Sequence, residues 1–159
     1  MPEKLNNRLT AIALDASIGG GPRPEAEHER RVAIYDLVED NSFTLAAHPH
    51  GPYKLKLSTA DGRLIFDVAN GADQRLSLIG LAMSPFRRIV KDYFMICENY
   101  NQAIRTATPS QIETIDMARR GLHDEGSGIL RERLSGKIDI DHATARRLFT
   151  LVCVLHWRG

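Results

Sequence analysis

The 159-residue chain lacks the features that would assign it to a specialised class of protein. Its two cysteines, Cys97 and Cys153, lie far apart and form no CxxC motif, so neither a disulfide nor a metal staple is expected. No run of residues approaches the roughly 18 apolar positions of a membrane span. The first residues also lack the apolar segment that directs secretion. We therefore expect a cytoplasmic protein that does not associate with a membrane and in which both cysteines are free thiols.

The chain also has little excess of either positive or negative charge. The formal net charge is +1, and residues 85–159 are only mildly basic, with 12 basic against 9 acidic residues. Proteins that bind nucleic acid usually show a stronger or more one-sided excess, so nucleic acid is not the expected partner. Arginine supplies 16 of the 21 basic residues, and its planar fork suits bidentate pairing with phosphate or carboxylate. GC-rich codon usage gives the same bias without any function.

The order of the patterns predicts one α+β domain over residues 1–159. We expect an antiparallel sheet of three to four strands packed on a C-terminal bundle of about three helices, with one N-terminal helix. Alternating apolar residues separated by Asp-Gly and Asn-Gly turns predict a three-stranded meander, and its strands are 53–58, 63–68 and 75–81. An N-terminal strand at 8–14 and a helix at 25–40, whose apolar face includes Val32, Ala33, Tyr35 and Leu37, precede them.

Two segments are rich in residues that break regular structure. Residues 17–24 contain three glycines and two prolines, and we expect a flexible loop there. Residues 44–52 are likewise predicted to form a loop, in which Pro49 and Pro52 favour extended or turn backbone. Neither segment has the spacing of a nucleotide-binding glycine motif.

The C-terminal half contains three predicted helices. The first begins with Ser84 as N-cap and Pro85, and its buried stripe is predicted to run from Phe86 to Ile104. The second begins with a capping box, Thr108-Pro-Ser-Gln111. Glycines at 121, 126 and 128 each weaken a helix interior by ~1 kcal/mol relative to Ala, so a bend or break is expected near residues 121–128.

The last helix, which begins at Asp141, is apolar on all sides between residues 148 and 155. A helix with this pattern is normally buried. We therefore predict that it is the central helix, with Leu148, Val152 and Leu155 in the core, and that Trp157 completes the core.

Four side chains within seven positions form the strongest candidate site: Arg119, Arg120, His123 and Glu125. Arg119 and His123 share a face at helical spacing. Arginine forks beside a histidine and a carboxylate suit the binding of an anion and the movement of a proton, with Glu125 orienting the imidazole. The structural alternative is a helix surface of Arg–Asp and Arg–Glu pairs, in which His123 satisfies a buried backbone carbonyl.

This cluster leaves three functions open, of which binding is preferred. A binding or regulatory protein would hold a small anionic ligand with Arg119 and Arg120, joined by Arg87 and Lys91, or would offer a protein-partner surface on the C-terminal helices. The alternative is a small enzyme that acts on an anionic metabolite through His123 as acid and base. Contact with a nucleic-acid backbone through converging Arg doublets is a weaker third hypothesis, and a homodimer also stays open.

The spacing of the histidine, glutamate and serine residues gives little support for a metal site or a catalytic serine. His48 and His50 form an HxH pair, which is an incomplete metal site. A di-iron bundle needs two Glu-x-x-His motifs, and the chain has one, at residues 25–28. Ser127 lacks the GxSxG elbow of serine hydrolases. We therefore expect no metal, no cofactor and no serine nucleophile.

Four stretches of the sequence resemble a known bacterial family. They are SPFRRIVKDYFMICE at 84–98, ATPSQIE at 107–113, IDMARRGLHDEGS at 115–127 and TARRLFTLVCVLHWRG at 144–159. These stretches are similar to the bacterial uncharacterised protein family 0262 (UPF family 0262), and the resemblance covers the whole chain. The family has no assigned activity, so the resemblance implies membership without implying a mechanism.

Overall fold

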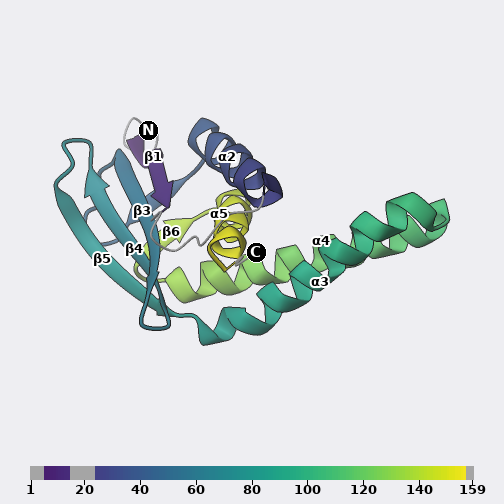
Figure 1. Cartoon of the computed structure of the whole chain (residues 1–159). Helices are drawn as coiled ribbons and strands as arrows, with labels where there is room; N and C mark the ends of the chain where they lie inside the picture. The colour runs from purple at the N-terminus through teal and green to yellow at the C-terminus, as the bar shows by residue number, and fades with distance from the viewer. Residues whose placement is uncertain (1–5, 15–23, 157–159) are drawn as a thin grey trace.

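The computed structural model describes residues 6–14 and 24–156 and has the predicted α+β architecture (Figure 1). A mostly antiparallel sheet lies on one side of the molecule and the helices lie on the other. The helices α3 (Ser84–Thr106) and α4 (Pro109–Leu134) extend beyond this body as a long helical hairpin (Figure 1). Trp157 and most of the predicted loop at 17–24 fall outside the described residues.

The larger sheet has four strands in the order β1-β3-β4-β5. β3 (Tyr53–Ala60), β4 (Arg63–Asn70) and β5 (Arg75–Ala82) form the predicted antiparallel meander. β1 (Leu9–Leu14) pairs with β3 in parallel. A parallel partner is brought in by a long connection, so no local pattern in the sequence could indicate it.

The tight turn between β3 and β4 follows directly from the sequence. Asp61 and Gly62 both have positive φ, 52° and 73°, as the two-residue turns that match the right-handed twist of a hairpin require. The predicted Asp-Gly turn is therefore confirmed.

A second sheet, of two strands, joins β2 (Phe43–Leu45) to β6 (Ile138–Ile140) in antiparallel register. The prediction of a loop over residues 44–52 is therefore wrong at its start, where the chain is still in β2. Three residues are too few for an alternating pattern to be recognised, and the partner strand lies far along the chain.

The described helices are α2 (Pro24–Glu39), α3 (Ser84–Thr106), α4 (Pro109–Leu134) and α5 (His142–His156). α3 packs along α4, while α5 contacts both α2 and α4, and Figure 1 shows α5 between these two helices. In the described ranges, no helix is long and apolar enough to cross a membrane.

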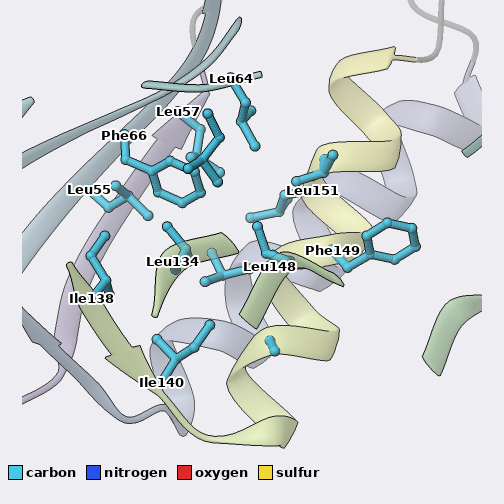
Figure 2. Close-up of a cluster of buried hydrophobic side chains, with 14 of the residues drawn as sticks. Leu55, Leu57, Leu64, Phe66, Leu134, Ile138, Ile140, Leu148, Phe149 and Leu151 are labelled. Atoms are coloured by element: carbon cyan, nitrogen blue, oxygen red, sulfur yellow. The ribbon is translucent and has the colours of Figure 1, made fainter. Parts of the chain in front are cut away.

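The core lies between the inner face of the larger sheet and α5 (Figure 2). Leu57 and Phe66 from the sheet face Leu148 of α5, with Leu134 of α4 among them, and all four are fully buried. Val152 is also fully buried, and Leu155 is 7% exposed. The prediction that the last helix is central is therefore confirmed.

The predicted bend at residues 121–128 is wrong, because α4 is one continuous helix from Pro109 to Leu134. Gly126 is buried against the ring of Phe149, whereas Gly121 and Gly128 have open space beside them. The helix tolerates all three glycines because its packing against α3 and α5 outweighs a propensity cost of ~1 kcal/mol each. Because α4 continues through Ser127, the backbone N–H groups there belong to the interior of the helix.

The sequence signals predict the correct N-cap residue for α4 but not for α3. The box at Thr108 is confirmed: the Gln111 backbone N–H donates to the Thr108 hydroxyl over 3.2 Å, and the Thr108 N–H donates to Oε1 of Gln111 over 3.1 Å. The N-cap of α3 is Met83 instead of Ser84, and it makes no side-chain cap bond. The Met83 carbonyl already accepts the Phe86 and Arg87 N–H groups, so the helix starts one residue early.

Two predicted apolar faces are buried only in part. α3 buries Phe86 and Val90, but Ile104, at the end of the predicted stripe, is 53% exposed because this part of α3 projects beyond the body (Figure 1). On α2, Leu37 is buried while Val32 and Tyr35 are exposed. Each helix meets the core along a narrower strip than its apolar residues indicate.

Candidate functional site

A cavity of about 440 Å³ lies where α5 meets α4, with α3 at its side. Four of the residues that line it are arginines, and they belong to two Arg-Arg doublets on different helices. The complete lining is Tyr93 from α3, Arg119, Arg120 and His123 from α4, and Ala143, Arg146, Arg147 and Thr150 from α5.

The helical repeat explains why these side chains meet. Arg119 and His123 are four residues apart on α4, as are Arg146 and Thr150 on α5, so each pair occupies one helix face. His123 and Thr150 join the two faces, because Nε2 of His123 lies 2.9 Å from Oγ1 of Thr150. The doublets therefore approach the same cavity from two helices.

Asp116 holds the first doublet in place. Nε of Arg119 donates to Oδ1 of Asp116 over 3.2 Å, a second Arg119 nitrogen bonds the same oxygen, and Arg120 pairs with Oδ2 at 2.9 Å. The hydrogen bond from Arg119 lowers the pKa of Asp116 below its usual value, and the positive charges of both arginines add to this effect. The Arg119 guanidinium also lies 4.3 Å from the centre of the Tyr100 ring, a cation–π contact that fixes its position.

The second doublet is less constrained. Arg147 donates to the backbone carbonyl of Asp40 over 2.8 Å. Among the residues that the structure describes, no hydrogen bond or ion pair is made by the exposed side chain of Arg146. Arg146 therefore offers a complete set of guanidinium N–H groups next to the cavity.

His123 is buried at the junction of the three helices and is 9% exposed. Its ring lies edge-on to Tyr93 and Phe149, with centroids 5.3 Å and 5.2 Å away. Burial, and then the positive charges of Arg146 and Arg119, lower the pKa of His123 from 6.5 to about 4, although Asp124 opposes the shift. The imidazole is therefore neutral at neutral pH.

The hydrogen bonds around Thr150 assign the tautomer of this imidazole. The Thr150 hydroxyl donates to the backbone carbonyl of Arg146 over 3.2 Å, so its oxygen accepts a hydrogen bond from the Nε2–H of His123. Nδ1 is then the unprotonated nitrogen, and it is buried without a hydrogen-bond partner in the described part of the chain. The predicted structural role for His123, a bond to a backbone carbonyl, is replaced by a bond to a hydroxyl.

The structure brings together three of the residues expected at this site. Arg119, Arg120 and His123 line the cavity. Glu125 is exposed and is not among the lining residues, so it does not orient the imidazole. Arg87 and Lys91 line a different hollow on α3, of about 290 Å³, together with Val90, Phe94, Met95 and Glu98.

Sequence reasoning missed the contribution of α5. In the sequence, Arg146 and Arg147 form one of the Arg doublets of the third hypothesis, contact with a nucleic-acid backbone, and nothing there marks Thr150 as a site residue. The four-residue spacing of Arg146 and Thr150 is visible in the sequence, but only the crossing of α4 and α5 shows that this face of α5 meets His123.

A close contact between a histidine and an aspartate lies near the cavity, and the described residues there hold no group of metal ligands. Nε2 of His142 lies 2.6 Å from Oδ1 of Asp124, whereas Arg120, four residues before Asp124, pairs with Asp116. Within residues 6–14 and 24–156, no three His, Cys, Asp or Glu side chains are placed to hold a metal ion. His48 and His50 are both exposed.

Comparison with known proteins places the whole chain in one family. The model of the Uncharacterised protein family (UPF0262) matches residues 6–158. A UPF0262 protein of Rhizobium meliloti (strain 1021) is 59% identical over 154 residues, covering 97% of both chains. UPF0262 proteins of Agrobacterium fabrum and Brucella abortus (strain S19) are 57% and 58% identical, and each alignment covers at least 96% of both chains.

No solved structure matches the chain. The relatives are bacterial and carry only the family name, which assigns no activity. On the family match and these identities, the chain belongs to the bacterial Uncharacterised protein family UPF0262.

Proposed function

We propose that the protein binds a small anionic metabolite, bearing phosphate or carboxylate, in the cavity between α4 and α5. One observation carries the proposal: two Arg doublets from different helices line one cavity, and the Arg146 side chain makes no ion pair among the described residues. Guanidinium groups form short, bidentate hydrogen bonds with phosphate and carboxylate. A cavity with this lining favours an anion over a neutral or cationic ligand.

Three of the four guanidinium groups are already held by protein partners. Asp116 fixes Arg119 and Arg120, and the Asp40 carbonyl fixes Arg147. Ordering long side chains costs ~0.5–1.5 kcal/mol each when it must happen during binding. Because most of that cost is met in the folded protein, this site is suited to binding.

The state of His123 favours a binding protein over an acid/base enzyme. A group with a pKa of about 4 carries no proton to donate at neutral pH and is a weak base, whereas efficient general acids and bases titrate near the working pH. The carboxylate expected to orient it, Glu125, is not beside it. His123 instead connects α4 to α5 through Thr150.

The same geometry favours a small ligand over a nucleic-acid backbone. Two of the C-terminal doublets share one concave site, while Arg87 lines a separate hollow and the Arg88 side chain is 94% exposed. Backbone binding usually needs a basic stripe, and the chain has a net charge of +1.

We also propose that the protein works in the cytoplasm. Cys97 and Cys153 are not joined in a disulfide, and disulfides are rare in a reducing compartment. Fractionation of the native host and detection with an antibody would test this.

The function is tested by titrating inorganic phosphate into the full chain at low salt, with isothermal calorimetry and thermal unfolding as readouts. The variant Arg146→Gln removes the charge that has no protein partner, and Arg88→Gln is the control because its side chain lies outside the cavity. We expect phosphate to bind and to raise Tm, with the effect reduced by Arg146→Gln and kept by Arg88→Gln. Equal binding by all three proteins, or binding by none, would overturn the proposal.

A further inference from the structure

We infer that the ligand of this cavity carries a diphosphate, with one phosphate held by Arg119 and Arg120 and the other by Arg146 and Arg147. This inference rests on the proposed function and goes beyond it by naming the ligand class. The basis is the division of four arginines into two pairs, one on α4 and one on α5, at a single cavity.

Both doublets keep positive charge at the cavity. Asp116 offsets one of the two charges of Arg119 and Arg120, while no carboxylate among the described residues pairs with Arg146 or Arg147. Asp124, which also acts on His123, lowers the net charge further. Because the remaining positive charge is divided between two helices, a ligand with two anionic groups can meet both parts at once.

Both pairs keep hydrogen-bond donors for a ligand. A guanidinium has five N–H groups. Arg119 and Arg120 share the two oxygens of Asp116, Arg147 uses one nitrogen on the Asp40 carbonyl, and Arg146 keeps all of its donors. Each doublet can therefore hold a phosphate without breaking the contacts that position it.

The size of the cavity agrees with a ligand larger than one inorganic ion. Its volume of about 440 Å³ lies within the range of roughly 300–1,000 Å³ typical of small-molecule sites. The space corresponds to on the order of ten or more waters at ~30 Å³ each. Tyr93 and Ala143 add surface that is not positively charged, which suits the organic part of a ligand that bears the diphosphate.

The test compares inorganic pyrophosphate with inorganic phosphate by calorimetry at fixed pH and ionic strength, without added metal. We expect the wild-type protein to bind pyrophosphate at least about tenfold more tightly, because the second phosphate adds further charge-assisted hydrogen bonds. Arg120→Gln and Arg146→Gln each remove one charge from a different doublet. Each should reduce the preference for pyrophosphate to a few fold, while Arg88→Gln should leave it unchanged.

Three further measurements keep the outcome clear. Arg146→Lys retains the charge without the planar fork, and it should lose part of the preference if bidentate contact matters. Circular dichroism checks that each variant is folded. Citrate, an anion of similar charge without phosphate, should bind more weakly than pyrophosphate.

The possible results separate the inference from the function on which it rests. If phosphate binds through Arg146 and pyrophosphate binds no more tightly, the ligand is a single anion: the inference fails and the proposed function stands. If pyrophosphate binds tightly and neither Arg120→Gln nor Arg146→Gln weakens it, the diphosphate lies elsewhere and the inference also fails. If neither anion binds, both proposals fall.

Discussion

Gly126 of α4 lies directly against the ring of Phe149 of α5, so closely that a Cβ at position 126 would come within 3.0 Å of three ring carbons. This contact sets how near the two helices approach, next to the hydrogen bond between His123 and Thr150. The glycine that indicated a break in the helix is therefore the residue that allows α4 and α5 to form the cavity.

Replacing this glycine should destabilise the protein even though alanine favours helix. Gly126→Ala gains ~1 kcal/mol of helix propensity but forces the Phe149 ring or a helix to move, and overpacking of this kind costs ~1–3 kcal/mol. Gly121→Ala and Gly128→Ala are matched controls on the same helix, since no atom of another described part of the chain lies within 4 Å of either added Cβ. Urea denaturation should show a lower free energy of unfolding for the first variant and up to ~1 kcal/mol of gain for the controls. A gain at all three positions would contradict the packing described here.

Shortening the buried leucine side chains of α5 should reduce the stability of the protein. Leu151 is fully buried and Leu155 is 7% exposed, so Leu151→Ala or Leu155→Ala should reduce the free energy of unfolding by ~2–5 kcal/mol through lost contacts and the cavity left behind. Met117→Ala, at a position that is 67% exposed, should change it by less than ~0.5 kcal/mol. Chemical denaturation of the three variants measures the difference. Similar values for α5 and Met117 would argue against a central α5.

The free energy of unfolding should fall as the pH is lowered from 6.5 toward 4, because His123 takes up a proton more readily in the unfolded chain. Its pKa is about 4 in the folded chain, against 6.5 for the unperturbed group, so between these values the unfolded state binds the proton and the folded state does not. The free energy of unfolding contributed by this group is therefore present above pH 6.5 and falls as pH decreases toward 4, with no further loss below. The total is on the order of 3 kcal/mol, at 1.36 kcal/mol per pKa unit.

Denaturant titrations at several pH values between 7 and 4 check this prediction. His123→Gln should flatten the dependence relative to wild type, whatever its effect at neutral pH. His50→Gln, at an exposed loop position, should keep the wild-type slope. An unchanged slope in His123→Gln would show that other groups cause the acid sensitivity.

The capping box at Thr108 should stabilise the tip of the helical hairpin locally. Thr108→Ala removes the hydroxyl that accepts from the Gln111 N–H, at a cost of ~1 kcal/mol. Hydrogen exchange should therefore become faster in the first turn of α4, where the affected N–H groups lie. Thr106→Ala is the control, because that hydroxyl only donates back to the Gln102 carbonyl within α3. Equal exchange in the two variants would count against the cap.

Several elements could be read from the sequence because their causes are local. The Asp61-Gly62 turn needs positive φ at both residues, the Thr108 box bonds groups three residues apart, and the apolar run of α5 predicts burial without reference to any neighbour. The Arg119, Arg120 and His123 part of the site belongs to the same class, since one helix face brings Arg119 and His123 together.

Tertiary structure decided what depends on distant partners. Local propensity marks Gly126 as a helix breaker, but the ring of Phe149 makes it a packing residue. Glu125 is near His123 in sequence, yet helical geometry points it elsewhere, and Thr150 of α5 takes the position beside the imidazole. The sequence by itself determined the helices, the meander and one half of the arginine cluster. The crossing of α4 and α5 alone added Arg146 and Arg147, because side chains from two helices converge only where packing brings the helices together.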